Sequence, residues 1–127
     1  MSDEAGRFEE NNRQDLKKRT KAFALRIVKF YASLPKTTEA QVLGKQVLRS
    51  GTSVGAPYHE AKRARSTAEF ISKIEGGLQE LEETVYWLEL LIEAEIVKPN
   101  TLQNLLSEAE ELTAILVASV KTAKGRK

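Results

Sequence analysis

The sequence predicts an all-α protein, an antiparallel up-down four-helix bundle, and three observations support this fold class. Apolar residues recur at helical spacing through four segments that short connections join. No segment shows the alternation of apolar and polar residues that marks a strand. With 7 Gly and 3 Pro among its 127 residues, the chain is poor in turn formers and long enough to bury one core.

The first helix is expected over residues 12–34, after a polar segment 1–11 that lacks periodicity and is expected to be a disordered tail. Asn12 starts the helix, with Asp15 three residues later. Pro35 ends it, because the residue before a proline disfavours the α conformation. The apolar positions at helical spacing are Leu16, Phe23, Ile27, Phe30 and Leu34.

The second helix is expected over residues 38–64, where Thr38 and Gln41 form a capping-box pattern. Pro57 lies inside it, removes one backbone donor and crowds the carbonyl four residues back, so we expect a kink near it. The residues that share the apolar face are Leu43, Val47, Ser50, Val54, Tyr58 and Ala61.

One edge of this second helix is lined by small residues. Each glycine in a helix interior costs roughly 1 kcal/mol relative to alanine, so a close approach of another helix should compensate. The approaching helix could belong to a second copy or to the same chain. Tryptophan is enriched in interface cores. The candidate residues for an oligomer interface are Gly44, Leu48, Gly51, Gly55, Trp87 and Leu91.

The third and fourth helices are expected over residues 67–96 and 100–123. Ser66 and Glu69 form a capping box before the third helix, and Pro99 lies in the break that separates the two. A basic tail over residues 124–127 is expected to fray. The apolar stripe of the third helix contains Phe70, Ile74, Gly77, Leu81, Val85, Leu88 and Ile92. The apolar stripe of the fourth helix contains Leu102, Leu105, Leu106, Ala109, Leu112, Leu116 and Val120.

Charge is distributed unevenly along the chain, although the net charge is only +2. Residues 1–65 carry 14 Lys/Arg and 7 Asp/Glu, whereas residues 66–127 carry 6 Lys/Arg and 11 Asp/Glu. This asymmetry is typical of a basic surface for a polyanion. It is equally compatible with basic helices that pack beside acidic ones and neutralise them.

The residue types argue against catalysis and against a metal or cofactor. Cysteine is absent, which excludes disulfides, thiolate metal sites and a cysteine nucleophile. His59 is the only histidine and has Ala56 three residues before it, so neither a Glu-x-x-His di-iron motif nor a Ser/His/Asp set is present. The glutamates at 75, 82 and 89 have no histidine or phosphate loop beside them and are read as a solvated acidic face. We therefore predict a non-enzymatic protein without cofactor or metal.

Targeting signals are not evident either. The first residues are acidic and polar, unlike a signal peptide. The longest unbroken apolar run covers residues 114–118, too short to span a bilayer. A cytoplasmic protein without a membrane partner is expected.

A basic surface is the candidate binding site. Lysines and arginines of the first two helices could neutralise phosphates. Few aromatic residues accompany them, so we expect contact with the backbone without base stacking or sequence readout. In the alternative, these cations pair with glutamates of the later helices, Arg49 with Glu82 or Glu89, in a structural scaffold without a nucleic-acid role. The candidate nucleic-acid-binding residues are Lys17, Lys18, Lys21, Lys45, Arg49, Lys62 and Arg63.

The run over residues 48–66, LRSGTSVGAPYHEAKRARS, resembles the signature of the four-helix-bundle family named for 23S rRNA intervening-sequence proteins. Segments 30–35, 69–74 and 80–88 also fit, and the resemblance covers roughly residues 16–120. The chain departs from the family at Pro57, where asparagine is usual.

The resemblance implies a ring-like homo-oligomer, typically a pentamer. The family is similar to the accessory variability determinant proteins of diversity-generating retroelements, which bind nucleic acid and a reverse transcriptase. The partners it implies are further copies of the chain, RNA or DNA, and a nucleic-acid enzyme such as a reverse transcriptase. We therefore predict a homo-oligomeric bundle that binds nucleic-acid backbone non-specifically.

Overall fold

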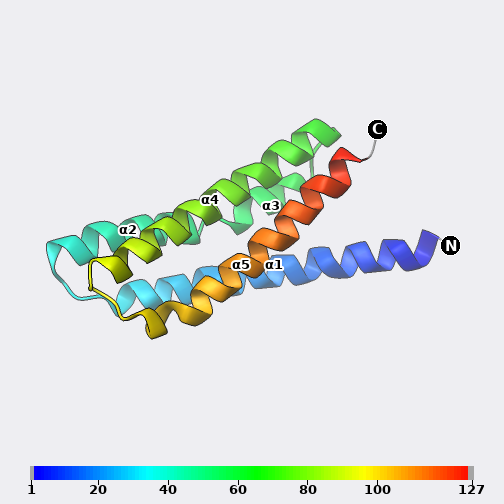
Figure 1. Cartoon of the computed structure of the whole chain (residues 1–127). Coiled ribbons are helices and arrows are strands. Elements are labelled where there is room, and N and C mark those ends of the chain that lie inside the picture. Colours follow the sequence, from blue (N-terminus) through cyan, green and yellow to red (C-terminus); the bar gives the residue numbers. More distant parts are fainter. Residues whose placement is uncertain (1, 126–127) are drawn as a thin grey trace.

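Four helical rods make up the fold (Figure 1). The structure, a computed structural model, describes residues 2–125 and the side chains of residues 16–125. Within that part of the chain every regular element is an α-helix, which confirms the predicted all-α bundle. The helices are α1 (Ser2–Ala32), α2 (Thr38–Gly51), α3 (Gly55–Ala61), α4 (Thr67–Glu93) and α5 (Pro99–Lys124), with α2 and α3 forming one interrupted rod.

The rods alternate in direction along the chain, as an up-down bundle requires (Figure 1). The α1 helix contacts α2, α3 and α5, and α4 contacts the same three helices. Among the described residues α1 and α4 do not approach each other, so they lie on a diagonal of the bundle. The outer faces of α1 and α4 are therefore on opposite sides of the molecule.

The first helix starts earlier than the sequence predicts. Residues 2–11 continue α1 as helix, in place of the expected disordered tail. Apart from Gly6, this segment contains three Glu, one Ala and one Arg, which are good helix formers, and Asp3 and Glu4 suit a helix N-terminus. A polar segment without an apolar stripe can thus extend a helix that is already nucleated. Met1 lies outside the described residues.

The second rod is interrupted at residues 52–54, close to the predicted kink near Ser53–Pro57 and with helix on both sides. Pro57 is the third residue of α3, where the backbone nitrogen has no intrahelical acceptor, so the proline removes no hydrogen bond. The hydroxyls of Thr52 and Ser53 donate to the carbonyls of Leu48 and Arg49, both at 2.6 Å. The Ser53 hydroxyl takes the place of its own amide, which donates to the Ser50 carbonyl instead, whereas the Thr52 amide still donates to the Leu48 carbonyl at 3.2 Å. The α3 helix ends at Ala61, before the predicted end at 64.

The third and fourth helices also differ at their ends. The backbone of Glu95 is left-handed, with φ of 60°, so α4 ends at Glu93 instead of continuing to 96. The amides of Ile96 and Val97 then donate to the carbonyl of Leu91. Lys124 belongs to α5 and Gly125 caps it, where the sequence predicts a frayed tail. Residues 126–127 of that tail lie outside the described residues.

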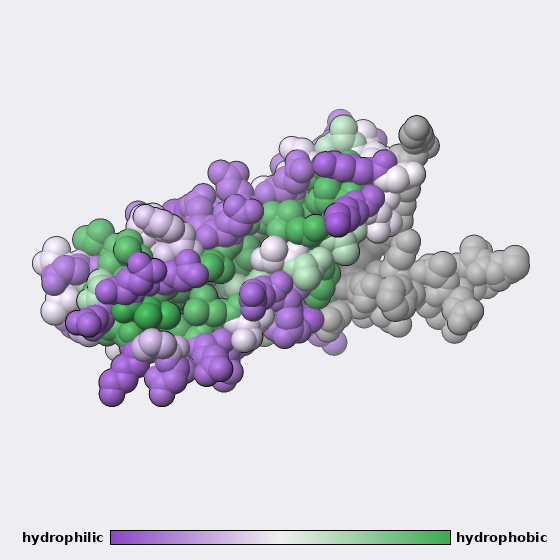
Figure 2. Space-filling view, viewed as in Figure 1, coloured by the Kyte–Doolittle hydropathy of each residue, from purple (hydrophilic) through white to green (hydrophobic). Residues whose placement is uncertain are grey.

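A single core joins the rods. The core positions predicted for the first helix are all buried, including Leu34, which follows the end of α1. Ile74, Leu81 and Leu88 of α4 are fully enclosed. On α4, half-buried apolar residues recur every seven positions beside this core, the spacing of helices that supercoil around each other. Figure 2 shows the resulting apolar strip along the face formed by α4 and α5, between hydrophilic rims. The recurring residues are Ile71, Leu78, Val85 and Ile92.

Candidate nucleic-acid interface

The structure divides the predicted basic residues between two surfaces. Lys17 and Lys21 of α1 flank Thr20, which is buried against α3. The contact is close, because a Cβ placed on Gly55 would lie 2.9 Å from the Thr20 hydroxyl. Lys17 and Lys21 are both exposed, and along α1 they lie just before and just after Thr20. They therefore lie next to α3.

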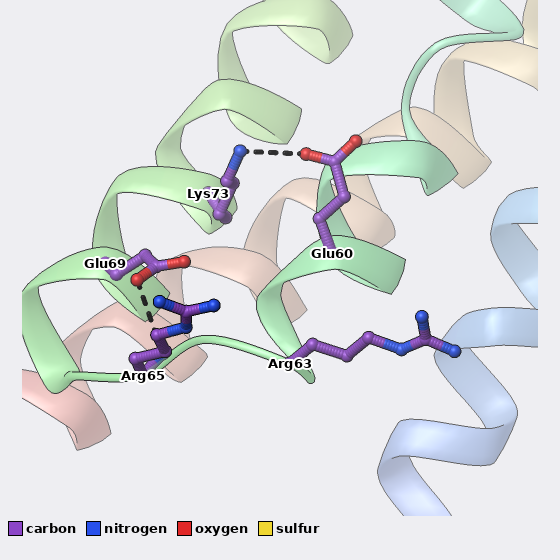
Figure 3. A pocket seen from close by; sticks show the side chains of 5 residues that line it. All are labelled: Glu60, Arg63, Arg65, Glu69 and Lys73. Carbon is purple, nitrogen blue, oxygen red and sulfur yellow. Dashed lines mark hydrogen bonds and ion pairs between the residues drawn. The ribbon is translucent and has the colours of Figure 1, made fainter.

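The end of α3 adds two cations to the same surface. The Lys62 ammonium lies 5.4 Å from the centre of the buried Tyr58 ring, a cation–π contact that orients the side chain. The exposed Arg63 side chain extends toward the α1 side of the molecule (Figure 3). We call Lys17, Lys21, Lys62 and Arg63 the basic α1–α3 group. Lys18 is exposed beside it, on the outer surface of α1.

The cations of this group are not neutralised by the part of the chain that the structure describes. No carboxylate among residues 16–125 lies within ion-pair distance of any of the four. The four positive charges therefore reinforce one another at a single surface. Such a surface attracts a polyanion and is screened by salt.

Arg49 has a different environment from the basic α1–α3 group. Its guanidinium bridges two carboxylates of α4, at 3.3 Å from Glu80 and 2.6 Å from Glu83. The predicted alternative role of Arg49, pairing with the third helix, is thus observed, with Glu80 and Glu83 in place of Glu82 and Glu89. Lys45 is exposed on α2, one helical turn before Arg49.

A polar hollow of about 470 Å³ lies at the turn from α3 to α4 (Figure 3). Glu60 accepts a hydrogen bond from the Lys73 ammonium at 2.9 Å, and this bond raises the pKa of Lys73 above its ordinary value. Glu69 accepts from the backbone amide of Arg65 at 3.3 Å. The residues that line the hollow are Glu60, Arg63, Arg65, Glu69 and Lys73.

Sequence reasoning missed Arg65 and Lys73 in this hollow. The spacing of Arg63 and Arg65 in the run KRARS was the available signal, since both lie in the short connection before the Ser66 cap. The carboxylates of the hollow could not be placed from sequence, because they depend on the angle between α3 and α4. Their presence makes the hollow mixed in charge, in contrast to the basic α1–α3 group.

Arg19 is a second cation with a structural role that the sequence did not reveal. It donates to Glu108 through Nε at 3.0 Å and through Nη2 at 2.7 Å, and to Glu111 at 3.0 Å. The hydrogen bonds to Glu108 are the main reason why the pKa of Arg19 is raised. Arg19 thereby joins α1 to α5.

The structure contradicts the predicted oligomer interface for Gly44, Gly51 and Leu91, because all three are buried within the single chain. Gly44 faces the side chains of Leu34 and Tyr31, and Gly51 faces Ile27. The helix that approaches the small-residue edge is thus α1 of the same chain, the alternative that the sequence left open. The other three predicted residues are half-buried, namely Leu48, Gly55 and Trp87.

Side chains for other chemistry are not assembled in the described part of the chain. No group of three or more His, Cys, Asp or Glu residues among those described is arranged to hold a metal ion. His59 is exposed on α3. None of the helices described has the length and apolar character needed to cross a membrane.

Comparison with known proteins identifies related sequences. The model of the family described as 23S rRNA-intervening sequence protein matches residues 12–118. A crystal structure from Bacteroides thetaiotaomicron, described as a protein of unknown function from the S23 ribosomal protein family, is 38% identical in sequence. The similarity covers 87% of this chain and 98% of the Bacteroides chain, with a TM-score of 0.81. No curated protein matches the sequence.

Proposed function

Because the chain belongs to the 23S rRNA-intervening sequence protein family, and the Bacteroides relative is described as a protein of unknown function, we propose a function from the surface chemistry of the chain. It binds RNA or DNA through the phosphate backbone and without reading sequence. The observation that supports this proposal is the basic α1–α3 group, whose four cations lack carboxylate partners among the described residues. Unpaired cations can release counterions from phosphates at little desolvation cost.

The aromatic residues near this group support backbone contact over base stacking. Tyr58 is only 4% exposed and Phe23 is fully buried, so neither ring can stack on a base. Tyr31 is half-buried and its hydroxyl donates to Gln41 at 2.9 Å. Recognition by such a surface depends on charge and shape.

We further propose that the protein acts by binding rather than catalysis, as a ring-like homo-oligomer of the pentameric type that the family resemblance implies. Repeating the basic α1–α3 group around a ring would raise the affinity for a long polyanion through multivalency. A reverse transcriptase or another nucleic-acid enzyme is the proposed protein partner, and the cytoplasm the proposed location.

A structural scaffold without a nucleic-acid role is the second candidate. The ion pairs of Arg19 and Arg49 favour it, because both cations bind carboxylates of the same chain. In this case the cations of the basic α1–α3 group serve only solubility. The two candidates differ in whether the protein binds polynucleotide at low salt.

The deciding experiment is fluorescence-anisotropy titration of generic RNA and DNA oligonucleotides over a salt series. Binding should weaken steeply with salt. The variant Lys62→Glu with Arg63→Glu should bind about 10-fold to 100-fold more weakly and lower the log–log salt slope by about 2, since each phosphate contact contributes about 0.9. The matched control is Lys36→Glu with Lys98→Glu, which changes the net charge equally at two exposed connections.

Three outcomes would count against the proposal. Wild-type protein that ignores polynucleotide at low salt would favour the scaffold. An equal loss of affinity in the Lys36/Lys98 control would mean that net charge, and not the basic α1–α3 group, is recognised. Arg49→Ala should lower the melting temperature and leave affinity nearly unchanged, so a large loss of affinity there would place the site on α2.

A further inference from the structure

The charges of α1 and α4 are opposite and almost unmixed. From Leu16 to the end of α1 the helix carries six basic residues and no acidic residue. The α4 helix carries seven glutamates and one basic residue, Lys73. Since α1 and α4 lie on a diagonal of the bundle, their outer faces cannot neutralise each other within one chain.

Each of these two faces also exposes large apolar side chains. Leu25 is 60% exposed and Val28 45% exposed on α1, with Lys18 and Lys29 exposed on the same surface. We call these four residues the α1 outer face. An apolar centre with a polar rim is the usual anatomy of a protein interface.

The opposite face presents one exposed aromatic ring among carboxylates. Tyr86 is 57% exposed, and its ring meets that of Trp87 edge-on with a 5.0 Å centroid separation. Glu82, Glu89 and Glu93 are exposed at helical spacing around Tyr86. We call Glu82, Tyr86, Glu89 and Glu93 the α4 outer face. The contact with Trp87 holds Tyr86 in place, which lowers the entropy lost when it is buried.

We propose that the α1 outer face of one copy packs against the α4 outer face of a second copy. Tyr86 packs against Leu25 and Val28, and the glutamates face Lys18 and Lys29. The inference rests on the self-assembly included in the proposed function and assigns the surfaces that form it. Because the two faces are different and lie on opposite sides of the molecule, the contact is heterologous and repeats from copy to copy.

This contact differs from the interface predicted from the small-residue edge of the second helix. The glycines of that edge are already covered by α1 of the same chain, whereas the α1 and α4 outer faces are exposed. It also leaves the α3 part of the basic α1–α3 group, Lys62 and Arg63, accessible to nucleic acid. Assembly and polyanion binding can therefore be tested separately.

Charge-reversal complementation tests the proposal, with mass measured by sedimentation velocity in the absence of nucleic acid. One variant carries Lys18→Glu and Lys29→Glu, so that both of its faces are acidic. The other carries Glu82→Lys and Glu89→Lys, so that both of its faces are basic. Each should associate about 100-fold more weakly than wild type, and wild-type association should weaken as salt rises.

Mixing the two reversed variants should restore association, since every contact between the two different variants joins an acidic face to a basic face. Recovery is scored as the formation of mixed dimers and larger species, because a closed ring of five would keep one contact between like-charged faces. The control is again Lys36→Glu with Lys98→Glu, which should assemble like wild type. Circular dichroism checks that all variants keep their helix content. If a reversed variant fails this check, Lys18→Gln with Lys29→Gln replaces it on α1, and Glu82→Gln with Glu89→Gln replaces it on α4. These variants remove charge without reversing it and should show an intermediate loss of association.

The possible failures are distinguishable. Wild-type protein that stays monomeric at all concentrations overturns both the assembly and this assignment. Wild-type protein that assembles, with reversed variants that assemble equally well, overturns the assignment alone. Reversed variants that dissociate but do not recover on mixing overturn the pairing of these two faces. Binding of nucleic acid by a monomeric reversed variant separates the two proposed activities.

Discussion

At the scale of single residues, the glycines of α2 lie where α1 packs closest against it. A Cβ on Gly51 would lie 2.8 Å from Cγ1 and 2.9 Å from Cγ2 of Ile27, whose side chain is fully buried. These atoms belong to the branch of the side chain and not to a flexible end. The small-residue edge therefore allows α1 and α2 of the same chain to pack closely. Gly76 on α4 differs, because the nearest atom to its Cβ position, on Pro57, is 4.0 Å away.

We predict that Gly51→Ala lowers the free energy of unfolding by about 1–3 kcal/mol, because the added methyl forces Ile27 or the helix to move. The control Gly76→Ala should raise it by up to about 1 kcal/mol, since alanine favours the helix and space is available. Urea denaturation followed by circular dichroism measures both. If Gly51→Ala were as stable as wild type, Ile27 could yield at no cost and the close crossing would not be required.

At the scale of helices, the break between α2 and α3 decides where Lys62 and Arg63 lie. Thr52 and Ser53 satisfy the end of α2 with their hydroxyls, and α3 begins afresh with Pro57 in its first turn. A short α3 then carries Lys62 and Arg63 to the side of α1. The position of two proposed phosphate contacts thus depends on an interruption of the rod.

We predict that Pro57→Asn, the residue usual in the resembling family, leaves the free energy of unfolding within about 1 kcal/mol of wild type or raises it. Proline at the third position of α3 removes no intrahelical hydrogen bond, so little is gained or lost when the amide returns. Chemical denaturation provides the measurement. A loss above about 2 kcal/mol would show instead that the proline ring, which lies next to Gly76 and Gly77, holds α3 against α4.

At the scale of the whole molecule, ion pairs between neighbouring helices neutralise part of the charge asymmetry and leave the rest exposed. Arg19 joins α1 to α5, Arg49 joins α2 to α4, and Lys73 joins α4 to Glu60 of α3. The outer faces of α1 and α4 have no such partner across the diagonal. Neutralisation by neighbouring helices therefore holds for Arg19, Arg49 and Lys73, whereas a basic surface for a polyanion stays a prediction for the other cations.

We predict that Arg19→Ala lowers the free energy of unfolding by about 1–2 kcal/mol, because the contact with Glu108 is bidentate and partly buried. The pKa of Arg19 is raised in the folded chain, so its contribution is present at pH values below the unfolded pKa and disappears only above the folded one. Both pKa values of Arg19, unfolded and folded, lie above the pH range of the measurement. The difference between wild type and variant, measured by urea denaturation, should thus be the same at pH 7 and pH 10.

Two results would contradict this account of Arg19. A difference that shrinks between pH 7 and pH 10 would show that the interaction depends on another group that titrates there. Lys73→Ala is the control, because its ion pair with Glu60 is exposed and contributes less. An equal loss in both variants would mean that burial of the Arg19 contact is unimportant.

How much of the candidate site the sequence could predict depends on the residue. Lys17, Lys21, Lys62 and Arg63 were selected by residue type and helical face, and the structure brings them to one surface. Arg49 was selected in the same way, yet it binds Glu80 and Glu83. Residue type and periodicity describe one helix at a time. Whether a cation meets a carboxylate depends on how two helices are rotated and placed relative to each other.

By itself, the sequence determined the all-α class, the four rods and most of the core, because burial of a helix follows from the local spacing of its apolar residues, as at Phe23, Ile27 and Leu88. The tertiary structure alone decided that Gly44 and Gly51 face α1 and that α1 and α4 lie on a diagonal. Both depend on the order of the rods around the core. The physical reason is that a helix specifies its own buried face through neighbours one turn away, whereas the identity of the helix that covers this face depends on residues far along the chain.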